Sequence, residues 1–393
     1  MKTEVRNAAE LAAWLTLPGP AVIQDLDLTA ASAEIAKRDL TGCSFLGCVM
    51  PPDLAKAAGE AHCLVLPPIE PSDEAPFNPY SVSMYTPREL YEGYDPEDPA
   101  TYDRYVDRKV YLSYMSLGPP AELKPVAADV LLLRRMHDAT IATALDGFVK
   151  NAQGRIVAIM GGHDRARSDE RYLQVAMLAL ELTRKNYIIA TGGGPGLMEA
   201  ANLGAYAAGF ADPEAVVKAS VEQLKAAPTY KDANWLKVGY KVWKGLGDPV
   251  DFQKSRNLGI PTWFYGHEPP NLFATDIAKY FENSVREEGL LAIAHSGVLF
   301  AEGNGGTVQE IFQDACQNYY RTYGQLKSPM VLLGTEYWNW TEPDYGNPAD
   351  KRRPVYPVLK KLASEKGFAD YVHITDSTAD AIDFIVRHPP VKA

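Results

Sequence analysis

The stretch TGGGPGLMEAANLGA, from Thr191 to Ala205, decides the fold predicted for this chain. Before it, Tyr187 to Ala190 form a short apolar run that is typical of a buried parallel strand. Three consecutive glycines then allow a turn too tight for side chains, and Leu197 to Ala201 are expected to begin a helix. Such a strand, turn and helix N-terminus binds phosphate through free backbone N–H groups and the helix dipole. The alternative is a tight turn without a ligand.

The glycine pattern excludes two common nucleotide-binding loops. A dinucleotide fingerprint requires G-x-G-x-x-G, but here the third glycine would fall on Leu197 or Glu199, counting from Gly192 or Gly194. The G-x-x-x-x-G-K-[ST] loop of nucleoside triphosphatases does not occur in the sequence. The simpler expectation is a single phosphate, such as that of a mononucleotide.

Composition indicates a soluble globular protein large enough for two domains. The chain has 393 residues, 46% hydrophobic and 23% charged, which is ordinary for globular proteins. A formal net charge of −11 argues against a nucleic acid polymer as partner, because such binding needs clustered Lys and Arg. The four cysteines include no C-x-x-C pair, which favours a reduced, cytoplasmic protein. No apolar run is long enough to span a membrane.

Residues 1–125 are expected to form a small α+β appendage. Three strand-sized apolar blocks, at 22–28, 44–50 and 63–66, alternate with helical stretches. The Pro- and Tyr-rich segment from Pro67 to Pro125 is too aromatic for disorder, so it is expected to wrap the next domain or a partner subunit. A helix over 126–152 connects this appendage to the main domain.

The main domain, residues 153–393, is predicted to be α/β, with a doubly wound, mainly parallel sheet. A strand at 155–160, a helix at 168–185 and a strand at 187–190 form a right-handed βαβ unit. Residues 211–256 are interpreted as an insertion. The other expected strands are 259–266, 297–301, 329–334 and 371–375, and the other expected helices are 272–287, 354–366 and 377–386.

A second glycine turn, Glu302-Gly303-Asn304-Gly305-Gly306-Thr307, follows the strand at 297–301 and opens a helix. Two such turns at the carboxyl ends of strands can converge on one ligand. Thr307 adds a hydroxyl suited to phosphate, and Glu310 lies one helical turn later on the same face.

A carboxylate at Glu310 would lie beside the phosphate, where like charges repel. This position indicates that Glu310 stabilises a developing positive charge or accepts a proton from water. Alternatively, Glu310 is a first-turn carboxylate that interacts with the helix dipole. Arg286 precedes the strand that leads into this turn, and its alternative role is a solvated cation at a helix end.

These residues resemble a known family. TGGGPGLMEAANLGA and EGNGGTVQE are similar to the paired motifs GGGxxGLM and PGGxGTxxE of the Lonely Guy (LOG) family, nucleoside 5′-monophosphate phosphoribohydrolases long mislabelled lysine decarboxylases. The resemblance runs from about Gly154 to His388 and covers neither the first 150 residues nor the insertion. The length fits the larger bacterial nucleosidase-type members. Two motif positions differ, because Glu302 replaces the proline and Asn304 a glycine. An acid at 302 could narrow the phosphate pocket or repel the anion.

The resemblance implies a Rossmann-like fold, a homodimer or higher oligomer, and hydrolysis of an AMP-like nucleoside monophosphate to free base and ribose 5-phosphate without metal or cofactor. It implies a catalytic Glu310, with Arg286 as the arginine that matches the family's. The implied phosphate-binding residues are Gly193, Gly194, Gly196, Gly305, Gly306 and Thr307. Further candidate substrate contacts, at strand ends or helix starts, are Gly162, Met198, Glu199, His267 and Asn271. A non-catalytic nucleotide-binding or signalling protein of the same fold remains the alternative, with the altered EGN motif as its signature.

Overall fold

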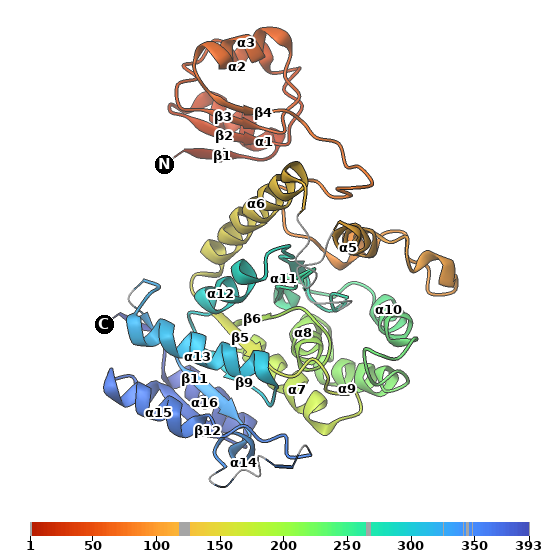
Figure 1. The fold of residues 1–393 in the computed structure, drawn as a ribbon, viewed down its shortest axis with the longest axis vertical. Coiled ribbons are helices and arrows are strands. Elements are labelled where there is room, and N and C mark those ends of the chain that lie inside the picture. Colours follow the sequence, from red (N-terminus) through yellow and green to blue (C-terminus); the bar gives the residue numbers. More distant parts are fainter. Residues whose placement is uncertain are drawn as a thin grey trace. The chain divides into compact units, whose positions relative to one another are not determined.

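The computed structural model describes residues 2–117, 126–264, 269–324, 326–340, 342, 346–347 and 349–392. The chain divides into two compact units (Figure 1). The first comprises Met1–Met84 and Leu112–Leu145, and the second Tyr85–Tyr111 and Asp146–Ala393. This division differs from the predicted boundaries, because residues 85–111 of the tyrosine-rich segment belong to the second unit. Helices α5 (Val106–Ser116) and α6 (Ala128–Ala152) contain residues of both units.

The first unit contains a four-stranded sheet whose strands follow one another in sequence order and are all parallel. Its core gathers apolar side chains of strands and helices, including Trp14, Ile23 and Phe45. The expectation of an α+β appendage is therefore corrected to α/β, because helices connect parallel neighbours. The strands are β1 (Thr3–Val5), β2 (Ala21–Gln24), β3 (Ser44–Leu46) and β4 (Leu64–Leu66), and the helices are α1 (Ala8–Thr16), α2 (Ser32–Ile35) and α3 (Pro52–Glu60).

The second unit is built on a seven-stranded sheet in the order β12-β11-β9-β5-β6-β7-β8, and all its pairings are parallel. This confirms the predicted doubly wound, Rossmann-like α/β fold. The strands are β5 (Ile156–Met160), β6 (Ile188–Thr191), β7 (Leu258–Gly259), β8 (Asp276–Ile277), β9 (Val298–Phe300), β11 (Met330–Leu333) and β12 (Val372–Thr375). The short strands β10 (Leu326–Lys327) and β13 (Val391–Lys392) pair antiparallel outside this sheet.

Helices cover both sides of this sheet in two packed groups (Figure 1). In one group, α7 (Glu170–Arg184) packs on α8 (Leu197–Ala207) and α16 (Thr378–Arg387). In the other, α13 (Gly305–Tyr320) packs on α12 (Asn283–Ile293) and α15 (Tyr356–Glu365). The remaining helices are α4 (Pro87–Leu90), η1 (Pro99–Thr101), α9 (Pro213–Leu224), α10 (Trp235–Leu246), α11 (Phe252–Ser255), α14 (Thr335–Trp338) and η3 (Ala369–Tyr371).

The order of the strands places a topological switch point between β5 and β9. From β5 the chain adds β6, β7 and β8 on one side, and then returns to add β9, β11 and β12 on the other. The helices that follow β5 and β9 therefore leave on opposite sides of the sheet. The carboxyl ends of two such strands border a crevice in which open α/β sheets bind ligands.

Two segments outside the regular sheet pattern belong to the core of the second unit. Tyr91 and Tyr105 of the tyrosine-rich segment are buried there, and the Tyr91 hydroxyl donates a hydrogen bond to the carbonyl of Pro270. Val217 and Trp235, from the stretch predicted to be an insertion, join the same core. Both segments therefore contribute to the stability of the second unit.

The predicted helix at 272–287 is wrong over its first eleven residues. Residues 272–282 form loops and strand β8, and helix α12 begins only at Asn283. Side chains take the place of helical hydrogen bonds here: Asn271 Oδ1 accepts from the N–H groups of Phe273 and Ala274, and Thr275 Oγ1 accepts from Asn257. Such local polar competition disfavours a helix.

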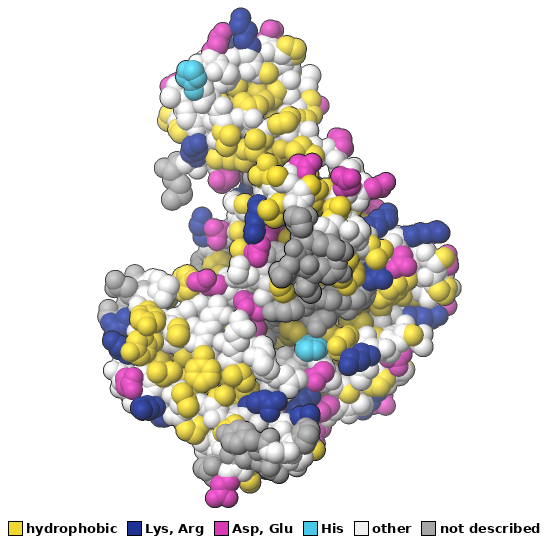
Figure 2. All heavy atoms as spheres, viewed as in Figure 1, with side chains coloured by type: hydrophobic (Ala, Val, Ile, Leu, Met, Phe, Trp, Pro, Cys, Tyr) yellow, Lys and Arg dark blue, Asp and Glu magenta, His cyan; other side chains and the backbone are white. Residues whose placement is uncertain are grey.

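The surface mixes charges of both signs. On the face shown in Figure 2, the basic and acidic side chains of the described residues are interspersed, and no broad basic patch gathers among them. No helix in the part of the chain that the structure describes combines the length and apolar character needed to span a bilayer.

Candidate functional site

A cavity of about 310 Å³ lies at the switch point, at the carboxyl ends of β5 and β9. Its volume lies at the lower end of the range of small-molecule sites. Six residues predicted from sequence line it together: Gly162, Met198, Arg286, Gly306, Thr307 and Glu310. The fold thus brings four separate segments of the chain to one crevice.

Glu310 and Arg286 form the charged centre of this cavity. Nη1 of Arg286 lies 3.8 Å from Oε1 of Glu310, and their side chains are only 11% and 13% exposed. Burial raises the pKa of Glu310 to about 7, although the nearby Arg286 lowers it and Glu287 raises it further. A carboxyl group that exchanges its proton near neutral pH is suited to general acid–base work.

The Arg286 side chain is held by the sheet. Its Nε donates a hydrogen bond to the carbonyl of Ile260, at 2.9 Å. Its guanidinium packs against the backbone of Gly192, so closely that a Cβ on Gly192 would collide with Nη2. The first glycine turn therefore leaves space for this arginine, a role that the sequence alone did not indicate.

The first glycine turn is buried along most of its length, and the structure does not place the expected phosphate-binding residues Gly193, Gly194 and Gly196 at the cavity. Residues 191–200 are all buried, and none of the three glycines lines the cavity. The backbone of Gly196, at φ +68°, packs against Gly162 and His163, and a Cβ there would overlap both. The N–H of Leu197, at the start of α8, donates its hydrogen bond to the carbonyl of Gly162.

The second glycine turn is open. Asn304, Gly305 and Gly306 are exposed at the N-terminus of α13, and a Cβ on either glycine would meet no atom within 4 Å. Asn304 does not cap the helix with its side chain but donates a hydrogen bond to Asp164. The start of this 16-residue helix therefore offers N–H groups and a positive dipole end to the cavity.

Glu302 points away from the cavity, which corrects the expectation that an acid at this position narrows the phosphate pocket or repels the anion. Its carboxylate pairs with Nη2 of Arg165 at 2.6 Å and with Nη2 of Arg171 at 2.7 Å. Glu302 is absent from the lining of the cavity. Two arginines thus neutralise the acid that replaces the motif's proline.

Two further candidate contacts, Glu199 and Asn271, do not line the cavity. Glu199 is fully buried in an ion pair with Arg167, with Nε 2.8 Å from Oε2, and accepts a hydrogen bond from the Tyr172 hydroxyl. It stabilises the packing of α8 and does not reach the cavity. Asn271 is also fully buried, and donates to the carbonyl of Gly194, so it braces the first turn. His267 lies outside the described residues.

Sequence reasoning missed two ionisable side chains of the cavity, His163 and Glu287. His163 lines it directly after Gly161-Gly162, at the carboxyl end of β5. Glu287 lines it next to Arg286 and accepts a hydrogen bond from Gln309. The position after β5 was a signal for His163, because β5 borders the switch point. No sequence signal distinguished Glu287 from the other acids of α12.

Comparisons with known proteins identify no family. No family model matches the sequence, and no curated protein matches it significantly. Solved structures similar to the chain include a molybdenum cofactor binding protein from Rippkaea orientalis, with 14% identity, a TM-score of 0.33, and coverage of 59% of this chain and 95% of that protein. A molybdenum cofactor carrier protein from Chlamydomonas reinhardtii has 17% identity, a TM-score of 0.33, and coverage of 59% and 96%. At such values the ligand of those proteins says nothing about this one.

Proposed function

We propose that this protein hydrolyses the N-glycosidic bond of a nucleoside 5′-monophosphate, the reaction that the resemblance to the LOG family implies. The observation that carries the proposal is Glu310: a cavity carboxyl with a pKa of about 7, 3.8 Å from Arg286 and one turn from an open helix N-terminus. These three features supply a base, a cation and an anion site within one crevice.

The phosphate is proposed to bind at Gly305, Gly306 and Thr307. The exposed backbone at the start of α13 allows an anion to approach the free N–H groups closely. Binding there fixes the ribose relative to Glu310, which reduces the positional freedom lost in the transition state. In this proposal the first glycine turn contributes by placing Arg286 and Met198, without contacting the phosphate.

In the proposed reaction the bond between C1′ and the base nitrogen breaks, and its electron pair leaves with the base. Positive charge develops at C1′, and the carboxylate of Glu310 stabilises it. A water oxygen bonds to C1′, and Glu310 takes the water's proton. The departing base nitrogen takes a proton from solvent and Glu310 releases its proton to solvent, so the products are a neutral base and ribose 5-phosphate and Glu310 is ionised again.

Base release from a panel of nucleoside 5′-monophosphates, read by chromatography, tests this proposal. Glu310→Gln is isosteric, so phosphate affinity should persist while base release falls roughly 10²–10⁴-fold. Glu288→Gln is the matched control, because Glu288 lies on α12, bonds to the Tyr323 hydroxyl and does not line the cavity. It should leave turnover unchanged.

Two results would overturn the proposal. If none of the nucleotides releases base although they bind at the cavity, the protein is a non-catalytic nucleotide-binding module. If Glu310→Gln turns over at the wild-type rate, Glu310 is a structural carboxyl and the chemistry belongs to other residues.

A further inference from the structure

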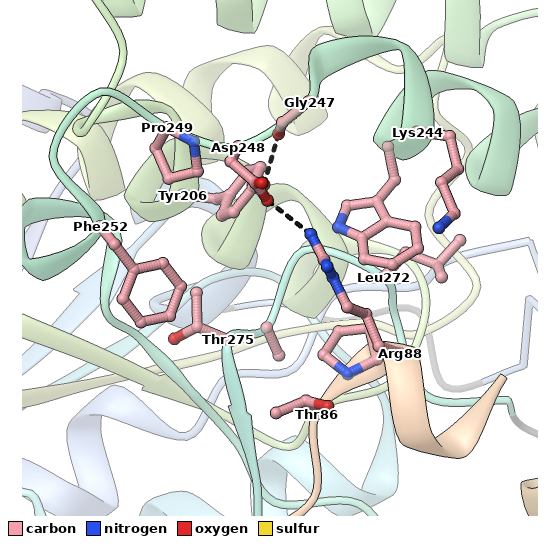
Figure 3. A pocket seen from close by; sticks show the side chains of 13 residues that line it. Thr86, Arg88, Tyr206, Lys244, Gly247, Asp248, Pro249, Phe252, Leu272 and Thr275 are labelled. Carbon is pink, nitrogen blue, oxygen red and sulfur yellow. Dashed lines mark hydrogen bonds and ion pairs between the residues drawn. The ribbon is translucent and has the colours of Figure 1, made fainter. Parts of the chain in front are cut away.

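A second cavity, of about 450 Å³, lies within the second unit and shares no lining residue with the candidate site (Figure 3). The start of α4, the end of α8, the end of α10, α11 and the segment before β8 form its walls. The proposed function does not use any of these residues. The volume lies within the range of small-molecule sites.

The walls of this cavity are mainly apolar and aromatic. Trp243 and Phe252 line it together with Leu272. Trp243 is 8% exposed, whereas Phe252 is 50% exposed. A half-exposed phenylalanine beside an apolar cavity leaves aromatic surface in water that a flat apolar ligand would cover.

The Tyr206 and Thr275 hydroxyls, which line this cavity, already have hydrogen-bond partners within the protein. The Tyr206 hydroxyl donates to the carbonyl of Gly247, and burial raises its pKa to about 12, so it remains a neutral phenol. The Thr275 hydroxyl donates to the carbonyl of Asn257. A ligand therefore does not need to satisfy either group.

Three charged side chains line the cavity: Arg88, Lys244 and Asp248. Figure 3 shows Arg88 extending to Asp248, where Nη2 and Oδ1 are 2.5 Å apart. Both side chains are highly exposed, at 67% and 80%, and exposed pairs of this kind contribute little stability. Lys244 places its ammonium 4.9 Å from the ring centroid of Trp243, and no carboxylate of the described residues lies within ion-pair distance of it. The lining therefore carries one net positive charge.

We propose that this cavity binds a small aromatic carboxylate. The ring packs on Trp243 and Phe252, and the carboxylate replaces Asp248 as the partner of Arg88. The exchange is favourable because Asp248 returns to water, where it is already largely solvated. The ligand carboxylate accepts two parallel hydrogen bonds from the guanidinium, a geometry that arginine favours. A single negative charge matches the net charge of the lining.

Calorimetric titration with naphthalene-2-carboxylate tests this proposal on the full chain. We expect saturable binding at one site per chain. The uncharged analogue naphthalene-2-carboxamide should bind about tenfold more weakly or worse, because it offers Arg88 no charge. Cyclohexanecarboxylate should also bind more weakly, because it keeps the charge but loses the aromatic face.

Substitutions of exposed residues then test which side chains bind the ligand, and they are not expected to disturb the fold. Arg88→Met should weaken binding of naphthalene-2-carboxylate about tenfold or more, and Phe252→Ala several-fold. Asp248→Asn should tighten binding, because it removes the group that competes for Arg88. Arg184→Met is the matched control: Arg184 forms an exposed pair with Glu181 and does not line this cavity, so binding should be unchanged.

The absence of saturable binding in the millimolar range would overturn the proposal. Equal affinity for the carboxylate and the carboxamide would do the same, as would binding that Arg88→Met and Phe252→Ala leave intact. None of these results depends on turnover of nucleotides, so the proposal can fail while the proposed function stands.

Discussion

The Arg286 guanidinium lies 3.8 Å from the Glu310 carboxylate, and the pair joins helices α12 and α13 across the candidate cavity. The cation favours the ionised carboxylate, and burial disfavours it. Burial prevails, because the pKa of Glu310 settles at about 7 and not below its ordinary value of 4.5. Glu310 is therefore poised between its two protonation states at neutral pH, with consequences for both rate and stability.

If ionised Glu310 is the general base, base release should rise with pH and level off above about 7. Below that pKa, kcat/KM should fall about tenfold per pH unit, because only the ionised fraction of the free protein reacts. In Arg286→Met the same limb should shift to higher pH, since the group that lowers the pKa of Glu310 is gone. Measuring kcat/KM for a nucleoside monophosphate between pH 5 and pH 9 checks both. A flat profile across this interval would exclude Glu310 as the base.

The same pKa predicts how the stability of Glu310→Gln depends on pH. The folded pKa of about 7 lies above the ordinary 4.5, so the folded state holds the proton more tightly than the unfolded state. The free energy of unfolding therefore decreases as pH rises between these two values. Glutamine has no proton to lose, so the variant should melt at a higher temperature than the wild type at pH 8. The difference should disappear below about pH 4.5. Thermal melts across this interval measure it, and a variant that melts lower at pH 8 would contradict the raised pKa.

Local patterns failed at β8, which lies in a stretch predicted to be a helix, and at β7, which covers only Leu258–Gly259 where a strand over 259–266 was expected. They were sufficient to predict the five other strands of the sheet and the two glycine turns. Each strand is a short apolar run bounded by turn residues, and the parallel pairing follows from the helices between them. The resemblance to the LOG family singled out Glu310 and Arg286, but the sequence did not predict that their side chains lie 3.8 Å apart.

Which glycine turn is open could not be predicted, because distant segments decide it. Pro261 packs on Gly193, and Asn271 donates a hydrogen bond to the carbonyl of Gly194, although both residues lie far along the chain. Likewise Glu302 is turned from the cavity by Arg165, 137 residues earlier. Long-range contacts of this kind leave no periodic signal in the sequence. The sequence therefore could not show that Glu302 pairs with arginines or that the three glycines of the first turn are buried.

Gly192→Ala should displace side chains of the candidate site, because Gly192 lies directly against them. The added Cβ would collide with Nη2 of Arg286 and lie 2.7 Å from Sδ of Met198, so both cavity side chains must move. We expect a loss of about 1–3 kcal/mol in the free energy of unfolding and lower turnover. Gly245→Ala is the control, because a Cβ there meets no atom within 4 Å and alanine favours the helix by about 0.5–1 kcal/mol. Chemical denaturation of both variants measures the difference. Equal stability of the two would mean that Arg286 does not depend on the space at Gly192.

Glu199→Gln distinguishes a structural carboxylate from a substrate contact. Glu199 is fully buried and accepts hydrogen bonds from Arg167 and Tyr172. Removing its charge leaves Arg167, itself 1% exposed, without a counter-ion inside the core, which costs about 3–5 kcal/mol of stability. The matched control is Glu181→Gln, since Glu181 pairs with Arg184 at the surface and its loss should hardly change the melting temperature.

In whatever fraction of Glu199→Gln remains folded, nucleotide affinity should equal that of the wild type, because the side chain does not line the cavity. Denaturation curves and a nucleotide titration on the same variant separate the two roles. Full stability together with weakened nucleotide binding would mean that Glu199 contacts the ligand after all.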